Sequence, residues 1–147
     1  MAFHVSKASQ YAIRALTHLA RQPASQAVLI REIAKVEGIP QPFLAKVVRM
    51  LGRCGLVETF KGPGGGIRLA RPPHQITVRE IIECVDGPTL FEGCFLGLST
   101  CSDDAPCPIH ENWKVIRERL IGELRSITLA DIAAVASRRD RLERSEG

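Results

Sequence analysis

The sequence lacks any apolar run long enough to span a membrane, and its first residues lack the charged-then-apolar layout of a secretory signal peptide. We therefore expect a cytoplasmic protein with no membrane partner. The 147 residues are 45% hydrophobic and 24% charged, which is typical of a globular chain rather than a disordered tail. Nothing in the sequence resembles a substrate pocket or an acid–base pair, so we expect neither an enzyme nor a small-molecule substrate.

The basic residues are concentrated in the N-terminal half, although the net charge is only +4. Up to Pro73 there are 11 Lys and Arg against 3 Asp and Glu, a balance of +8. The remainder has 9 against 13, a balance of −4. This division indicates a nucleic-acid-binding domain, residues 1–73, joined to a second domain, residues 74–147, with another task. A solvated basic surface is the alternative interpretation.

Hydrophobic periodicity predicts three helices in the basic half, at residues 7–21, 29–36 and 42–53. The second and third are short and separated by a glycine turn, which is typical of a helix-turn-helix. Phe43 and Leu44 begin the inward-facing stripe of the third helix, whose outward face is basic and fits the major groove of DNA. A lysine-arginine solvent face is the alternative. The candidate DNA contacts of this helix are Gln41, Phe43, Ala45, Lys46 and Arg49.

Two short β-prone runs, 56–60 and 67–70, flank a glycine-rich tip and predict a β-hairpin. No Gly-Lys-Ser/Thr follows and no helix opens at its end, so we do not expect a nucleotide-binding loop. Directly after a helix-turn-helix, the hairpin is better interpreted as a DNA-binding wing. Its candidate DNA contacts are Lys61, Gly62, Gly64, Gly65 and Arg68.

The second half predicts helices at about 78–85 and from Ile109 to about Ile127, then a short helix from Thr128 to about Ala136 and a frayed tail. The long helix carries a coiled-coil-like apolar seam, which either packs on the basic half or pairs with a second copy. We favour a homodimer, because a dimeric helix-turn-helix reads two half-sites one turn apart. The candidate interface residues are Ile109, Trp113, Ile116, Leu120 and Leu124.

Five cysteines, an odd number, in a reducing compartment favour metal or redox chemistry over a disulfide framework. Cys54 and Cys84 fall among apolar neighbours and are predicted to be packed thiols. The other three and a histidine form the pattern Cys-x6-Cys-x5-Cys-x2-His, which lacks the Cys-x2-Cys pairs of a zinc ribbon. Its wide, uneven gaps favour an iron–sulfur cluster, and the alternative is a regulator with structural zinc or no metal. The candidate ligands are Cys94, Cys101, Cys107 and His110.

His110 also has a plainer interpretation, as a solvent-facing side chain at the start of a helix. Asp103 and Asp104 are expected to be polar loop residues rather than ligands.

The motifs Ser-x-x-Tyr-Ala-Ile-Arg-Ala-Leu, Ile-Ala-Lys-Val-Glu-Gly-Ile-Pro-Gln-Pro-Phe-Leu and Gly-Leu-Val-Glu-Thr-Phe-Lys-Gly-Pro-Gly-Gly-Gly precede the three cysteines and the histidine. Together they resemble the Rrf-type winged-helix transcriptional regulators, which include IscR, NsrR and RirA. The resemblance covers nearly the whole chain. It implies a mainly α fold with a small β-hairpin: a winged helix-turn-helix and a long dimerisation helix. It further implies a bacterial homodimer whose cluster state sets its affinity for operator DNA.

Within this resemblance, the Cys-Pro-x-His ending is similar to IscR, which favours a [2Fe-2S] cluster with His110 as fourth ligand. NsrR-like members use a carboxylate from the first helix of the partner subunit as a ligand. This chain has Gln10 at that position, and an amide is a poor ligand, so [4Fe-4S] is kept only as the alternative. Ala45 stands where IscR has glutamate, so the base preference does not carry over. Lys61 replaces an arginine, which keeps the charge but loses the bidentate fork. The sensed signal, and whether the protein is a repressor or an activator, stay open.

Overall fold

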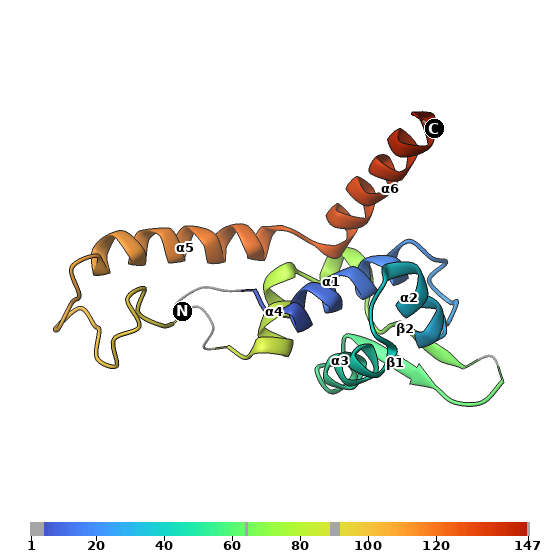
Figure 1. Cartoon of the computed structure of the whole chain (residues 1–147), viewed down its shortest axis with the longest axis horizontal. Helices are drawn as coiled ribbons and strands as arrows, with labels where there is room; N and C mark the ends of the chain where they lie inside the picture. The colour runs from blue at the N-terminus through green and yellow to red at the C-terminus, as the bar shows by residue number, and fades with distance from the viewer. Residues whose placement is uncertain (1–4, 64, 89–91, 147) are drawn as a thin grey trace.

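The computed structural model describes residues 5–63, 65–88 and 92–146. Within them the chain is mainly helical, with one small antiparallel hairpin (Figure 1). The elements in order are α1 (Lys7–Ala20), α2 (Ile30–Glu37), α3 (Gln41–Arg53), β1 (Val57–Phe60), β2 (Gly66–Leu69), η1 (Pro73–Gln75), α4 (Val78–Asp86), α5 (His110–Ser126) and α6 (Leu129–Ser145). None of the described helices is long and apolar enough to cross a membrane.

The helix-turn-helix forms where the periodicity predicted it. The hydroxyl of Ser6 accepts a hydrogen bond from the backbone N–H of Ser9 and caps α1. Gly38 ends α2 with φ of 66°, a left-handed conformation that glycine adopts without strain. The turn lets α3 pack against both α1 and α2.

The hairpin pairs β1 with β2, placing Val57 opposite Leu69 and Phe60 opposite Gly66. A third extended segment joins it, because Val28 and Ile67 exchange two backbone hydrogen bonds of 2.8 Å. These hydrogen bonds join the hairpin to the loop before α2 and thereby to the helix-turn-helix, as expected for a wing.

One buried core joins both halves of the sequence. Ile76, Ile81 and Val85 pack with the core residues of α1 and α3, and fully buried Leu129 belongs to the same cluster. The backbone N–H of Leu129 also donates to the carbonyl of Ile76, at 2.8 Å. A domain boundary near residue 73 stays a prediction, but the packing is continuous across it.

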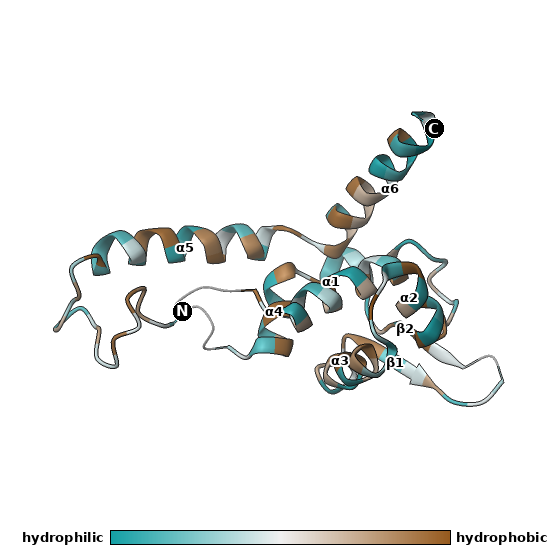
Figure 2. Ribbon diagram, viewed as in Figure 1, coloured by the Kyte–Doolittle hydropathy of each residue, from teal (hydrophilic) through white to brown (hydrophobic). Residues whose placement is uncertain are grey.

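Helix α5 projects away from the core, so that the loop leading into it and the hairpin lie at opposite ends of the molecule (Figure 1). Only its last turns pack on the body, where Leu120 and Leu124 contact the buried residues Val78 and Ile82 of α4. Apolar residues continue along the projecting part (Figure 2). Ile116, for example, is 57% exposed.

The predicted end of the last helix at Ala136, with a frayed tail, is wrong. Helix α6 continues to Ser145. Two side-chain interactions hold the added turns: an ion pair between Arg21 of α1 and Asp140, and an i,i+4 pair between Arg139 and Glu143 at 3.0 Å. The first joins residues 119 positions apart in sequence, so the local pattern did not reveal it.

Helix α6 begins with a complete capping box. The hydroxyl of Thr128 accepts from the N–H of Asp131 at 3.2 Å, and the N–H of Thr128 donates to the Asp131 carboxylate at 2.9 Å. We expect Thr128→Ala to lower the free energy of unfolding by about 1 kcal/mol, because one helix N–H loses its acceptor. Urea denaturation measures this; Thr100→Ala, in an exposed loop, is the control and should change little. Equal losses in both variants would contradict the assignment.

The prediction that Cys54 and Cys84 are packed thiols is also wrong. The two are joined by a disulfide, with Cα atoms 6.1 Å apart. Cys54 caps the C-terminus of α3 and Cys84 lies in the last turn of α4, so the packing of these helices brings the two together.

Candidate metal centre and nucleic-acid interface

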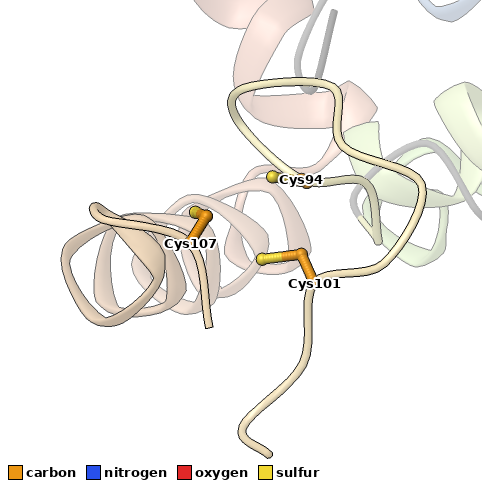
Figure 3. Close-up of side chains that lie close together, drawn as sticks. All are labelled: Cys94, Cys101 and Cys107. Atoms are coloured by element: carbon orange, nitrogen blue, oxygen red, sulfur yellow. The ribbon is translucent and has the colours of Figure 1, made fainter. Parts of the chain in front are cut away.

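The three remaining cysteines gather beside the start of α5. Cys94 and Cys101 come from the loop, and Cys107 lies three residues before the helix begins (Figure 3). Their sulfur atoms all lie within 4.8 Å of one another. Cys107 is buried, whereas Cys94 and Cys101 are half-buried. Three soft ligands therefore converge on one place that is sheltered but reachable from solvent.

The loop backbone favours the ionised form of one of these thiols. The N–H of Leu98, with that of Leu96, stabilises the thiolate and lowers the pKa of Cys94 to about 7, against the effect of burial. Since the thiolate is the form that binds metals, part of the ligand set is ready at neutral pH.

His110 joins the cysteines from the first residue of α5. It is 8% exposed, which contradicts the alternative of a solvent-facing histidine. Its Nδ1 lies 3.2 Å from the sulfur of Cys101, and its Nε2 lies 2.9 Å from the carboxylate of Asp103. The imidazole thus connects the cysteines to a carboxylate.

Asp103 was expected to be a polar loop residue, but in the structure its carboxylate contacts two other side chains. Its carboxylate bonds to His110 and also accepts from the ammonium of Lys114, at 3.2 Å. These two contacts lower the pKa of Asp103, so it carries negative charge at neutral pH. A carboxylate seven positions before a histidine is not a recognised metal-site spacing, which is why the sequence did not reveal the contact between Asp103 and His110.

Trp113 was predicted to lie in a dimer interface, but it is buried within its own chain. Its indole N–H donates to the carbonyl of Gly93 at 2.9 Å, and its ring centroid lies 5.5 Å from that of Phe95. Trp113 therefore fixes the start of the cysteine loop on α5. Of the other interface candidates, Ile116 is exposed, Ile109 is half-buried, and Leu120 and Leu124 pack partly on α4.

The candidate DNA face of α3 is exposed at Gln41, Lys46 and Arg49, whereas Ala45 is half-buried. Among the described residues, neither Lys46 nor Arg49 forms an ion pair. The prediction that Phe43 faces inward is wrong: the ring is 37% exposed and meets the ring of Tyr11 edge-on at 5.4 Å. Its contact with Tyr11 places it at the edge of the core, whereas the next residue, Leu44, is fully buried.

The hairpin residues differ in what they offer to DNA. Lys61 and Gly62 are exposed at the tip, Gly65 is buried against the backbone, and Gly64 lies outside the described residues. Arg68 is already engaged, because its guanidinium bonds to Glu58 at 2.9 Å and lies 4.6 Å from the centre of the Phe60 ring. Lys61 is therefore the better placed of the two wing cations.

Comparison with known proteins agrees with this arrangement. The profile of the Rrf2 family, described as an iron-dependent transcriptional regulator, matches residues 5–135. A protein of Aquifex aeolicus (strain VF5) assigned as an HTH-type transcriptional regulator is 38% identical over 125 residues, which cover 84% of this chain and 86% of that protein.

Two solved structures share the fold. The IscR of T. potens has a TM-score of 0.72 and 29% identity, covering 91% of this chain and 88% of that one. CymR (YrzC), the global cysteine regulator of B. subtilis, has a TM-score of 0.77 and 26% identity, covering 90% and 98%. Relatives named IscR are likewise described as HTH-type transcriptional regulators. The chain belongs to the Rrf2 family of DNA-binding transcriptional regulators.

Proposed function

We propose that this regulator is a homodimer that binds operator DNA with an affinity set by an iron–sulfur cluster on Cys94, Cys101, Cys107 and His110. The observation that carries the proposal is the convergence of three cysteine sulfurs within 4.8 Å of one another, with an imidazole nitrogen 3.2 Å from one of them. A [2Fe-2S] cluster is favoured over [4Fe-4S], because the Cys-Pro-x-His ending resembles that of IscR and Gln10 stands where NsrR-like members have a carboxylate. The site of action would be the bacterial cytoplasm.

The residues present fit such a group. All three cysteines can act as thiolates, and the low pKa of Cys94 supplies one at neutral pH. With Asp103 accepting from Nε2–H of His110, the lone pair of Nδ1 faces Cys101, which is the tautomer that a metal ligand needs. A bound cluster would supply one-electron redox chemistry, which the side chains lack.

Helix α4 connects the candidate metal centre with the candidate DNA face. Its last residue, Asp86, directly precedes the segment that leads to the cysteines, and accepts a 2.5 Å hydrogen bond from the buried hydroxyl of Ser9 in α1. The same helix packs against α3. A change in the conformation of the cysteine loop would therefore be transmitted through α4 to α3. It would shift the equilibrium between conformations of the protein that differ in DNA affinity.

Pairing of two copies through α5 is supported by the apolar residues that the single chain leaves exposed. Val115 and Ile116 on the projecting part of α5 are 65% and 57% exposed. Burying such a strip against a second copy would remove it from water and place two α3 helices on one DNA duplex.

One zinc ion is the second candidate, and a specific observation favours it. Three thiolates on a tetrahedral zinc, with bonds of about 2.3 Å, stand roughly 3.8 Å apart. The observed separations, all within 4.8 Å, are compact enough for that arrangement. The description of the family as iron-dependent and the likeness to IscR favour iron instead.

Preparation without oxygen, followed by iron, sulfide and zinc analysis and by absorption and EPR spectra, separates these candidates. We expect about two iron and two sulfide ions per chain. Cys107→Ser should abolish the visible absorption, whereas Cys84→Ser, outside the metal centre, should keep it. Zinc without sulfide would establish the second candidate, and a protein that binds no metal would refute both.

Asp103 provides a finer test of the ligand assignment. Asp103→Ala is expected to weaken metal binding about 10- to 100-fold, because His110 loses the acceptor that orients it. Asp104→Ala is the matched control, since this neighbouring carboxylate is exposed like Asp103, while the bonds to His110 and Lys114 belong to Asp103. Competition with a chelator, with Zn²⁺ or Co²⁺ as the probe, measures the affinity. Equal affinities for the two variants would show that His110 is not held as a ligand.

A further inference from the structure

Cys54 and Cys84 form a second pair of sulfur atoms, apart from the candidate metal centre. We propose that they are a thiol–disulfide exchange site that takes a low-molecular-weight disulfide as oxidant and covalently locks α3 to α4. The carrying observation is their placement: they lie 30 residues apart in sequence, yet their Cα atoms are 6.1 Å apart and their sulfurs are bonded. This Cα separation lies within the range that a disulfide bridges without moving the backbone.

The two sulfurs differ in their access to solvent. Cys54 is exposed at the end of α3, whereas Cys84 is half-buried and packs against the main core. An exchange site needs this asymmetry, because one sulfur must meet the incoming disulfide and the other must resolve the mixed intermediate. Exposed Cys54 is placed to react with the incoming disulfide, and Cys84 is placed to resolve the mixed disulfide.

The exchange reaction needs one co-reactant, a small disulfide. The Cys54 thiolate attacks one sulfur of the small disulfide, whose S–S bond breaks and releases one thiol. The Cys84 thiolate then attacks Cys54, forms the protein disulfide and releases the second thiol. Two protein thiols lose two electrons and two protons, and one small disulfide becomes two thiols. Excess small thiol reverses both steps.

Both states are compatible with the fold. Leu51 of α3 and Ile81 and Val85 of α4 belong to one buried cluster, so the helices stay packed when the covalent bond is absent. Reduction would replace a covalent joint by apolar packing alone. In a reducing cytoplasm, as proposed above, the pair would be reduced at rest and close under oxidation.

The bond also sits where it can affect the DNA face. Cys54 lies between Arg49 on the α3 face and the first strand of the hairpin, and the N–H of Leu56 donates back to the carbonyl of Leu51 at 3.0 Å. Cys84 lies two residues before Asp86, where α4 ends. The disulfide therefore ties the junction of α3 and the wing to the helix that leads to the metal-binding loop.

This effect on DNA rests on the proposed function, whereas the thiol exchange does not. The full-length protein, kept without oxygen, is equilibrated in buffers of reduced and oxidised glutathione. Differential alkylation with peptide mass spectrometry then reports the state of each cysteine. Binding of both forms is measured on a duplex selected from a random DNA pool by the reduced protein. The double variant Cys54→Ser/Cys84→Ser is the control.

We expect a Cys54–Cys84 disulfide to form and to reverse with excess thiol, and the apparent Kd for DNA to change about fivefold or more between the forms. The double variant should bind DNA and not respond. Two thiols that stay alkylatable throughout would overturn the exchange site. An unchanged Kd, or an equal response of the double variant, would overturn the link to DNA. If no form binds DNA, the proposed function fails, while the alkylation pattern still decides on the exchange site.

Discussion

The double substitution Lys46→Ala/Arg49→Ala is expected to weaken binding to duplex DNA by roughly 50- to 100-fold near 0.1 M salt. Each phosphate contact contributes about 0.9 to the slope of log K against log salt, so the slope should fall by about two. The structure supports this size of effect, because both cations are exposed on one face of α3. Within the described part of the chain no carboxylate pairs with either cation, so their charge is available to DNA.

Fluorescence anisotropy with a labelled duplex, measured over a range of salt concentrations, gives both quantities. Arg139→Ala is the matched control, since this arginine is exposed on α6 and paired with Glu143. Lys61→Ala alone should reduce the slope by about one. An unchanged slope in the double variant, or an equal loss in the control, would place the DNA surface elsewhere.

Gly66→Ala is expected to cost at least about 2 kcal/mol of folding stability, which is a large part of the total for a chain of this size. Gly66 has φ of 137°, and an added Cβ would lie 2.4 Å from the carbonyl oxygen of Val28. That oxygen accepts from the N–H of Ile67, so the clash falls on the contact that holds the wing to the loop before α2.

Gly52→Ala is the contrasting variant. Gly52 is inside α3, and a Cβ there would have no neighbour within 4 Å. Alanine should therefore raise stability by about 0.5 to 1 kcal/mol, through the higher helix propensity alone. Chemical denaturation of both proteins measures the difference. Destabilisation of similar size in the two would show that the approach to Val28 is not the cause.

Most of the fold could be predicted because its determinants are local. Ser6, Thr77 and Thr128 each accept a hydrogen bond from an N–H three residues further along, so the starts of α1, α4 and α6 are visible in short stretches of sequence. The three cysteines were likewise identifiable from their spacing in one loop.

The features that escaped prediction depend on contacts between distant residues or on loop conformation. The last turns of α6 rely on the pair of Arg21 and Asp140, and the disulfide relies on the packing of α3 on α4. The contact of Asp103 with His110 depends on how the cysteine loop turns back. Periodicity and composition carry no information on such contacts.

Leu129 has a consequence for the order in which the chain can fold during synthesis. It is fully buried in the core that α1, α3 and α4 share, so that core is incomplete until residue 129 has left the ribosome. The segment that carries Cys94, Cys101 and Cys107 precedes residue 129 and has already been made by then. A nascent chain therefore completes this shared core only after its cysteine loop has been synthesised.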